Sequence, residues 1–260
     1  MTVGRTFETL SRLDGKLAVV TGGSGWLGQS ICDVFVELGA DVVSVGRSRC
    51  HVQSVRSVTF DMSLDAFNTH IDETLTDCLH GHASVDILVN NMCSWPTNHD
   101  FMTTDITALR STFDNNVITQ LMFTQAIVRT MIETGTGGSI INIASMYGSV
   151  APQQRMYRGQ GGNALAYGAA KAAMIQSTKY LASLLGCHGI RVNSVSPGPF
   201  PRPGAFDGKQ WFEEELQTRT MLGRCATPDE LKGVVALLAS DLGSYITGAD
   251  IPVDGGWTAW

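Results

Sequence analysis

The stretch from residue 16 to residue 38 constrains the fold of this chain more than any other. It begins with residues 16–21 (KLAVVT), a short run rich in β-branched residues that is typical of a buried parallel strand. Gly22, Gly25 and Gly28 follow at once, and apolar residues then recur at helical spacing from Leu27 to Leu38. A glycine turn between a strand and a helix lets the backbone approach a pyrophosphate, so the unit predicts dinucleotide binding. The plainer alternative is a tight turn without a ligand.

Strands and helices alternate along the rest of the chain in the same way. Alternation of this kind predicts an α/β protein with a doubly wound parallel sheet of the Rossmann type. We expect a short arm at residues 1–15 and a single domain at 16–260, because 260 residues suit one domain of this class. Further strands are predicted at 41–45, 57–60, 86–90, 139–144, 190–195 and 250–253, and helices at 64–80, 103–133, 164–186, 210–221 and 228–240.

Composition argues against several classes of protein. The formal net charge of −6 disfavours a nucleic-acid surface, and no apolar run reaches the length of about 18 residues that predicts a membrane span. The N-terminal residues lack the apolar segment of a secretory signal, so a cytoplasmic location is expected. The six cysteines form no C-x-x-C pair and are expected to be free thiols. His80 and His82 have no third ligand in a plausible cluster, so no metal is expected.

Tyr167 and Lys171 are the first candidates for chemistry. They stand four residues apart in a predicted helix and therefore lie on one of its faces. A phenol has an ordinary pKa of about 10 and is a weak acid or base at neutral pH. An ammonium beside it favours the phenolate, so Lys171 is expected to lower the pKa of Tyr167 and make it a usable general acid/base. An ordinary helical side-chain pair is the alternative, since this spacing is common by chance.

Ordered segments resemble the motifs of the short-chain dehydrogenase/reductase family, and together they extend over nearly the whole chain. The glycine turn, the Tyr167/Lys171 pair and Ser145 after the fifth predicted strand are three of them. The chain is therefore identified as a member of that family. The other matches are Asp61, Asn90-Asn91-Met92-Cys93, Asn116 in residues 116–119 (NVIT), residues 191–198 (RVNSVSPG), and the late segments 246–248 (ITG) and 253–256 (VDGG).

The resemblance implies an oxidoreductase that transfers hydride between a nicotinamide cofactor and a carbonyl or alcohol substrate. Tyr167 would exchange a proton with the substrate oxygen, and Ser145 would hydrogen-bond that oxygen. Lys171 would also hold the nicotinamide ribose, and Asn116 would position a water in a proton relay, with Asn115 as a rival. Donors preset around the oxygen stabilise charge that develops only in the transition state. The complete set argues against a noncatalytic NADP-binding regulator.

The cofactor site implied by the resemblance departs from the family pattern in two places. Trp26 stands where the short form has glycine, which gives the T-G-x-x-G-x-x-G spacing of the family's extended branch, and Met92 and Cys93 replace alanine and glycine. We expect cofactor binding to survive both changes. Trp26 is interpreted as a core-facing residue without a role in recognition, although its place in the glycine turn also puts it among the implied cofactor contacts. The implied cofactor-binding residues are Gly22, Ser24, Gly25, Trp26, Leu27, Gly28, Arg47, Asp61, Met62, Asn90, Tyr167, Lys171, Pro197 and Gly198.

The choice of cofactor is indicated at the end of the second predicted strand. A carboxylate there would bind the 2′-hydroxyl of NAD, and an arginine would accept the 2′-phosphate of NADP. Residues 45–49 (VGRSR) contain Arg47 and Arg49 and no carboxylate, which favours NADP(H). NAD(H) is the alternative, because arginine also stacks on adenine.

Residues 149–164 form an insertion beside the predicted acid/base pair. The insertion is rich in amide, guanidinium and glycine groups, which suits a polyhydroxylated or anionic ligand. We therefore predict a sugar, sugar phosphate or nucleotide sugar as substrate, and expect a second, lid-like segment at about 197–222. A solvated surface loop or a subunit contact is the alternative. The candidate substrate-binding residues are Arg155, Tyr157, Arg158 and Arg202.

A second, looser similarity concerns the pathway and the assembly. The insertion, the glycine spacing and residues 253–260 are similar to short-chain reductases of bacterial surface-sugar and flagellin-glycan pathways. The alternative substrate is a small keto ester, keto acid or secondary-metabolite ketone. Members of the family are commonly homotetramers or homodimers, and Trp257 and Trp260 suit either a subunit interface or a tail folded back on the domain.

Overall fold

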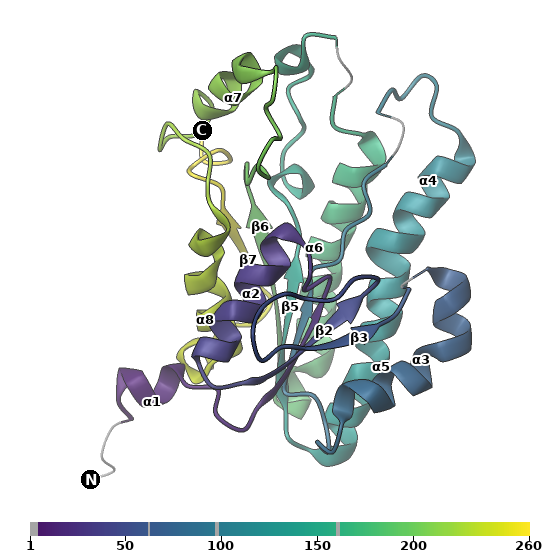
Figure 1. The fold of residues 1–260 in the computed structure, drawn as a ribbon, viewed down its shortest axis with the longest axis vertical. Coiled ribbons are helices and arrows are strands. Elements are labelled where there is room, and N and C mark those ends of the chain that lie inside the picture. The colour runs from purple at the N-terminus through teal and green to yellow at the C-terminus, as the bar shows by residue number, and fades with distance from the viewer. Residues whose placement is uncertain (1–4, 62, 97–98, 160–161) are drawn as a thin grey trace.

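A parallel β-sheet forms the centre of the computed structural model, which describes residues 5–61, 63–96, 99–159 and 162–260 (Figure 1). Within these residues the sheet has seven strands in the order β3-β2-β1-β4-β5-β6-β7, and every neighbouring pair is parallel. The order reverses between β1 and β4, where a ligand crevice is expected in such sheets. The strands are β1 Leu17–Thr21, β2 Asp41–Gly46, β3 Arg56–Thr59, β4 Ile87–Asn90, β5 Gly138–Ile143, β6 Ile190–Pro197 and β7 Asp250–Val253.

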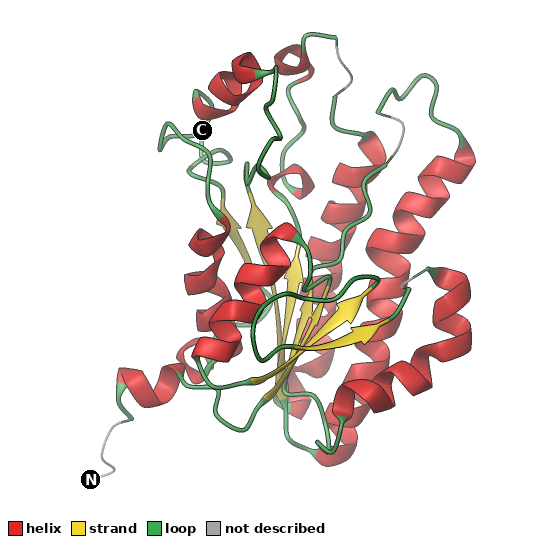
Figure 2. Ribbon diagram, in the orientation of Figure 1, coloured by secondary structure: helices red, strands yellow, loops and turns green. Residues whose placement is uncertain are grey.

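Helices cover both faces of the sheet (Figure 2). Leu17 and Val19 of β1 pack toward α3, α5 and α6, whereas Ala18 and Val20 pack toward α2 and α8. Burial on both faces explains why β1 is apolar at successive positions rather than alternating. The predicted single Rossmann-type domain is confirmed. The helices are α1 Phe7–Ser11, α2 Trp26–Glu37, α3 Leu64–Leu79, α4 Ile106–Phe113, α5 Thr119–Thr134, α6 Leu165–Leu185, α7 Gln210–Gln217 and α8 Lys232–Ala239.

The helical segments predicted at 103–133 are the helices α4 and α5 in the structure. A π-helical turn, Asp114–Ile118, separates α4 from α5. Its wider backbone is accompanied by side-chain bonds to main-chain carbonyls, since the Asn116 amide donates to Thr112 O at 2.9 Å and the Thr119 hydroxyl donates to Asp114 O at 3.1 Å. Single π-turns inside helices often mark functional sites. This one brings Asn115 to the cavity described below.

Smaller differences concern the ends of elements. Strand β6 continues to Pro197 because Pro197 lies opposite Val253 of β7 and Gly198 N donates to Val253 O at 3.0 Å. The helix predicted at 210–221 ends at Gln217, and α8 is preceded by a 3₁₀ turn, Pro228–Leu231. The described part of the arm contains α1, and Leu13 behind it is fully buried.

All six cysteines lie in the described residues and none is in a disulfide. Cys32 of α2 and Cys50 after β2 lie together under the glycine turn, where both thiols contact Gly23 O, at 3.9 and 3.4 Å. The hydrogen bond from Cys32 lowers the pKa of Cys50 to about 6. No helix in the described part of the chain is long and apolar enough to span a bilayer.

Candidate active site

A cavity of about 650 Å³ opens at the carboxyl ends of the strands, where the order of the sheet reverses. Its wall includes Gly22 after β1, Arg47 after β2, Asn91 after β4, Ser145 after β5 and Pro197 at the end of β6. Residues far apart in the sequence meet there because parallel strands all end at one edge of the sheet. The size is that of a pocket for a cofactor or substrate.

The glycine turn forms one end of this cavity. Gly22 has a φ of +65°, and a β-carbon on Gly22 would lie 3.1 Å from Met92 Cα. A β-carbon on Gly28 would lie 2.2 Å from Gly22 O, so Gly28 permits close packing although it does not line the cavity. The backbone can therefore approach a phosphate here, next to the N-terminus of α2. The predicted residues Gly22, Ser24, Gly25, Trp26 and Leu27 all line the cavity.

Trp26 is the first residue of α2 and lines the cavity rather than facing only the core. Its indole Nε1 is buried and has no hydrogen-bond partner among the described residues. A buried donor without a partner is uncommon in folded proteins. Together with the glycine turn, this unused donor fits an anionic nucleotide cofactor.

Two predicted residues, Arg47 and Asp61, line the far end of the cavity, at the ends of β2 and β3. Both are exposed. The Asp61 carboxylate accepts a hydrogen bond from Ser63 N at 3.1 Å, which fixes the loop after β3. Met62, the other residue predicted there, lies outside the described residues.

Asn90 and Asn91 have different surroundings. Asn90 is buried, and its amide donates to Thr124 Oγ1 and to Asn142 Oδ1, both at 2.8 Å, so its side chain joins β4, α5 and β5. Asn90 does not line the cavity, but Asn91 does. The Asn91 amide donates to Thr21 O at 3.1 Å and Gly22 O at 2.9 Å, and so it holds the glycine turn against the end of β4. The sequence predicted Asn90 as a cofactor contact, whereas the structure places Asn91 at the cavity.

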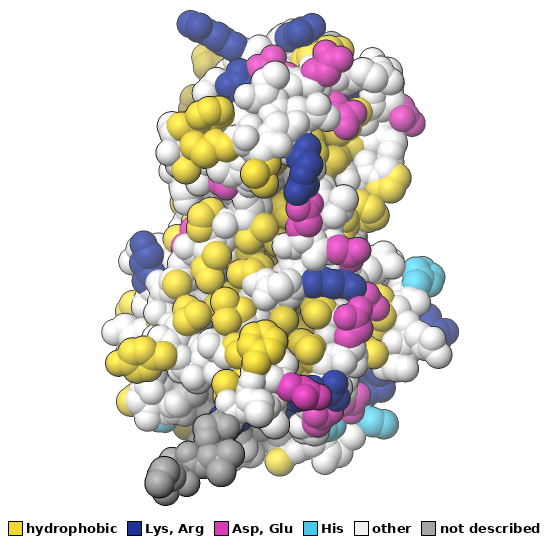
Figure 3. Space-filling view, turned by 90° about the vertical axis from the view of Figure 1, so that its left-hand side faces the viewer, with side chains coloured by type: hydrophobic (Ala, Val, Ile, Leu, Met, Phe, Trp, Pro, Cys, Tyr) yellow, Lys and Arg dark blue, Asp and Glu magenta, His cyan; other side chains and the backbone are white. Residues whose placement is uncertain are grey.

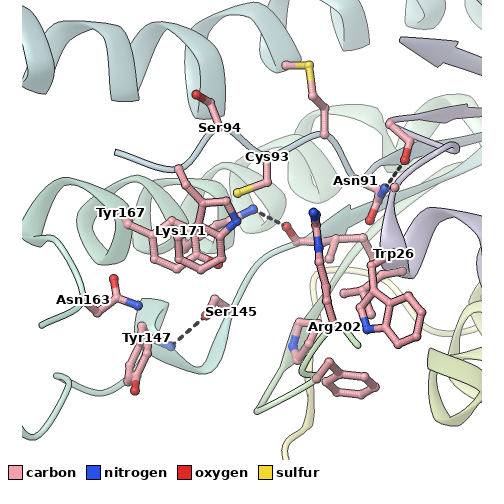
Figure 4. A pocket seen from close by; sticks show the side chains of 18 of the residues that line it. Trp26, Asn91, Cys93, Ser94, Ser145, Tyr147, Asn163, Tyr167, Lys171 and Arg202 are labelled. Carbon is pink, nitrogen blue, oxygen red and sulfur yellow. Dashed lines mark hydrogen bonds between the residues drawn. The ribbon is translucent and has the colours of Figure 1, made fainter. Parts of the chain in front are cut away.

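Ser145, Tyr167 and Lys171 meet in the middle of the cavity (Figure 4). Tyr167 and Lys171 come from one face of α6, and Ser145 follows β5 and hydrogen-bonds the tyrosine. Lys171 is almost fully buried and its ammonium donates to Ile143 O at 2.7 Å. The same nitrogen lies 5.8 Å from the centroid of the Tyr167 ring. The structure therefore brings together three of the four predicted catalytic side chains.

Burial shifts the pKa values of Tyr167 and Lys171. It raises the pKa of Tyr167 above the ordinary phenol value, the Cys93 thiol raises it further, and the hydrogen bond with Ser145 opposes both. Burial also lowers the pKa of Lys171. The expectation that Lys171 lowers the pKa of Tyr167 is therefore not met, because the net effect is a rise. Removing the phenolate from water costs more free energy than a nearby positive charge contributes. Tyr167 holds its proton at neutral pH and is placed to donate it to a carbonyl oxygen.

Asn116 does not line the cavity. Its carboxamide is fully buried and bonds twice to the backbone of Ser94: Ser94 N donates to Oδ1 at 3.0 Å, and Nδ2 donates to Ser94 O at 2.8 Å. This reciprocal pair fixes the loop that follows β4. Asn115, the rival for the relay, lines the cavity instead. The relay role stays a prediction, and the structure adds a positioning role for Asn116.

Trp95 belongs to the loop held by Asn116 and was not among the predicted site residues. Its indole stacks on the Tyr167 ring, with centroids 4.5 Å apart and planes 14° apart. The residue is nevertheless 57% exposed, so it covers one face of the tyrosine and presents its own other face outward. The position of Trp95, two residues after Cys93, was the available signal in the sequence.

The insertion packs against the lid-like segment. Its 3₁₀ turn, Gln154–Tyr157, places the Tyr157 ring 5.4 Å from Phe212 of α7, and the Arg158 guanidinium lies 4.4 Å above the Trp211 ring. The hydroxyls of Tyr157 and Tyr147 are 3.0 Å apart at the cavity wall. The two segments thus cover one end of the cavity, where Tyr157, Phe206 and Phe212 line it, and we call them the roof. We call this end the substrate end, because the candidate substrate residue Tyr157 lies there.

The four candidate substrate-binding residues do not all reach this cavity. Tyr157 and Arg202 line it, and Figure 4 shows Arg202 among the residues around Lys171 and Trp26. Arg155 and Arg158 are exposed and do not line it. Arg158 is instead engaged with Trp211, a contact between distant segments that residue spacing could not indicate.

Comparison with known proteins agrees with the fold and this arrangement. A family model described as enoyl-(acyl carrier protein) reductase matches residues 25–258. The chain belongs to the short-chain dehydrogenase/reductase family, and it is an oxidoreductase that uses a nicotinamide cofactor. When bound, that cofactor would accept or supply the hydride, and Ser145, Tyr167 and Lys171 are placed to orient the substrate and move the proton.

The curated relatives include enzymes acting on different alcohols. The chain is 30% identical over 262 residues to galactitol 2-dehydrogenase (L-tagatose-forming) of Cereibacter sphaeroides, covering 98% of this chain and 99% of the relative. It is also 30% identical to a 7alpha-hydroxysteroid dehydrogenase of Bacteroides fragilis, covering 96% of both chains. The relatives therefore support the reaction class more strongly than any one substrate.

Solved structures of similar proteins contain both nicotinamide cofactors. A short-chain dehydrogenase of Leptospira borgpetersenii with bound NAD+ has a TM-score of 0.85 and 27% identity, covering 99% of this chain and 98% of that one. A gluconate 5-dehydrogenase of Burkholderia cenocepacia in complex with NADP and tartrate has a TM-score of 0.84 and 26% identity, covering 97% and 99%.

Replacing Tyr167 with Phe removes the proton that the geometry supplies to the substrate oxygen. We expect turnover to fall by about 10² to 10⁴-fold while the affinity for the cofactor is unchanged. Tyr180→Phe is the matched control, because Tyr180 lies on the same helix and is exposed. Steady-state kinetics and cofactor titration measure both effects, and near-normal turnover in Y167F would refute the assignment.

The same residue sets the pH dependence. Alcohol oxidation needs Tyr167 without its proton, and burial raises the pKa of that group. The oxidation rate of the wild-type enzyme should therefore rise with pH through the alkaline range, and this rise should vanish in any residual activity of Y167F.

Proposed function

We propose that this enzyme oxidises or reduces a sugar, a polyol or a related sugar acid or phosphate. The observation that carries the proposal is the lining of the substrate end, where the hydroxyls of Tyr147 and Tyr157 and the guanidinium of Arg202 share one cavity with Ser145 and Tyr167. Polar groups of this kind recognise hydroxyl-rich or anionic ligands. The relatives named for galactitol and gluconate support the same class.

Arg202 is the residue assigned to a negative charge on the substrate. It follows the Pro197–Pro201 segment and lines the cavity. Burial raises the pKa of the Cys93 thiol, and the positive charges of Lys171 and Arg202 partly oppose that rise. Its side chain makes no hydrogen bond or ion pair with the described residues, so its donors are available to a ligand. A guanidinium binds carboxylate or phosphate through two parallel hydrogen bonds.

Arg202→Ala tests this assignment against Arg155→Ala, a control in the exposed part of the insertion. With an anionic sugar substrate, R202A should raise KM about tenfold or more, because it removes a charge-assisted hydrogen bond. R155A should leave KM unchanged. Initial rates over a panel of polyols, ketoses, aldonates and sugar phosphates give the result. A wild-type preference for keto esters or apolar ketones over the whole panel would favour the alternative substrate class, which the nearby Phe206 and Phe212 could contact.

NADP(H) is the cofactor that we favour over NAD(H). Arg47 lines the cavity directly after β2, and no carboxylate follows β2 in residues 45–49. An arginine at this place can pair with a 2′-phosphate. We expect kcat/KM to be higher with NADPH than with NADH.

Arg47→Ala should reduce this preference about tenfold, because one charge-assisted hydrogen bond is lost. Arg49→Ala is the matched control, since Arg49 is exposed two residues away and does not line the cavity. A wild-type preference for NADH, or equal effects of the two substitutions, would contradict the assignment.

A homodimer or homotetramer is the assembly that we propose. Hydrophobic side chains gather on the face that carries α8 and β7 (Figure 3). Tyr245, which follows α8, and Trp260, which follows β7, are strongly exposed. Strand β7 is an edge of the sheet, and Pro252 in it lacks a donor for strand addition. Face-to-face packing of two copies about a twofold axis would cover these groups. Trp257, in contrast, is buried against Tyr147 within the chain.

Sedimentation equilibrium tests the assembly. The chain has a mass of 27.9 kDa, and we expect a species of two or four such masses at micromolar concentration. A single species at the mass of one chain would contradict the proposal.

A cytoplasmic location completes the proposal. It is supported by six cysteines without disulfides, which suit a reducing compartment.

A further inference from the structure

Asn163 is the last residue of the insertion but one, directly before Ala164 and α6. It lines the cavity, and Figure 4 shows its carboxamide beside Tyr147 and on the Tyr167 side of the site. The insertion therefore delivers one polar side chain next to the proton donor, in addition to Tyr157 in the roof.

The carboxamide has an unused hydrogen-bonding atom. Asn163 Oδ1 is buried and has no partner among the described residues. Buried polar atoms are almost always hydrogen-bonded, and the exceptions call for an explanation such as a ligand. Two of the side chains with such an atom, Trp26 and Asn163, line the cavity, and they lie in different parts of it. Trp26 is beside the glycine turn, whereas Asn163 is beside the catalytic tyrosine.

The chemistry of the site limits what can pair with Asn163. Ser145 and Tyr167 already address the reacting oxygen, so Asn163 addresses a different atom of the substrate. A neutral carboxamide oxygen accepts a hydrogen bond and does not attract an anion. A hydroxyl group both donates and accepts, so it can pair with either end of the carboxamide. The outward face of Trp95, stacked on Tyr167, offers an apolar surface for the carbon skeleton that carries such a hydroxyl.

We propose that Asn163 is a specificity-determining residue that hydrogen-bonds a second hydroxyl group of the substrate, distinct from the one that reacts. The inference deepens the proposed sugar or polyol activity and rests on it for the identity of the physiological substrate. The enzyme then selects molecules with at least two oxygens in a set arrangement, and it rejects analogues that leave the buried Oδ1 without a partner.

The test compares kcat/KM for pairs of substrates that differ by one hydroxyl, in wild-type enzyme and in Asn163→Ala. The pairs are polyols or sugars with their deoxy analogues, together with 3-hydroxybutan-2-one and butan-2-one. We expect the wild-type enzyme to favour the hydroxylated member, and N163A to lose about tenfold of that preference at one hydroxyl position. The loss should arise from the hydroxylated member, while the deoxy member keeps its kcat/KM.

Two controls separate specificity from structure. Arg155→Ala changes the same insertion outside the cavity and should keep the wild-type preference. The thermal midpoint of N163A should equal that of the wild type, because Oδ1 makes no hydrogen bond with the described residues whose loss could destabilise the fold.

The outcomes distinguish the two proposals. If only the simple ketones are turned over, the sugar or polyol function fails, and the Asn163 assignment is decided by the simple-ketone pair. If wild-type enzyme does not discriminate within any pair, or N163A keeps the full preference in every pair, the assignment of Asn163 is overturned.

Discussion

The site depends on the close contact between the glycine turn and the end of β4. Asn91 donates to the carbonyls of Thr21 and Gly22, and the absence of side chains at Gly22 and Gly28 allows the backbone segments to approach. This contact holds the two strands at the point where the sheet order reverses. The cavity therefore results from the way the strands pair. The candidate catalytic residues Ser145, Tyr167 and Lys171 reach its wall from segments that follow β5.

Burial gives these groups their chemical character. Lys171 donates a hydrogen bond to the carbonyl of Ile143, and the Tyr167 ring stacks on Trp95. In such surroundings a phenol stays neutral, so Tyr167 in the described structure is a hydrogen-bond donor rather than a charge. Preset donors suit a reaction in which negative charge appears on oxygen only as hydride arrives.

Local spacing predicted what lies within single elements, and long-range packing decided the rest. The strand–turn–helix unit and the Tyr167/Lys171 pair follow from helical and strand periodicity, so the Rossmann-type fold and the centre of the site were accessible from the sequence. The arginine positions were not, because Arg158 is directed by Trp211 of a segment more than fifty residues later. The position of Trp95 depends on the hydrogen bonds between Asn116 and the backbone of Ser94, and the position of Asn163 depends on how the insertion joins α6. Neither contact leaves a periodic signal.

The two segments of the roof pack against each other and against Met146 and Tyr147. The insertion meets α7 through Tyr157 with Phe212 and Arg158 with Trp211, whereas the proton donor and its partners stand on β5 and α6. The roof and the proton-transfer groups thus come from different segments, which meet at Tyr147 and Tyr157. An evolving lineage can replace residues of the roof while Ser145, Tyr167 and Lys171 stay the same, so new substrate ranges can arise with the same reaction.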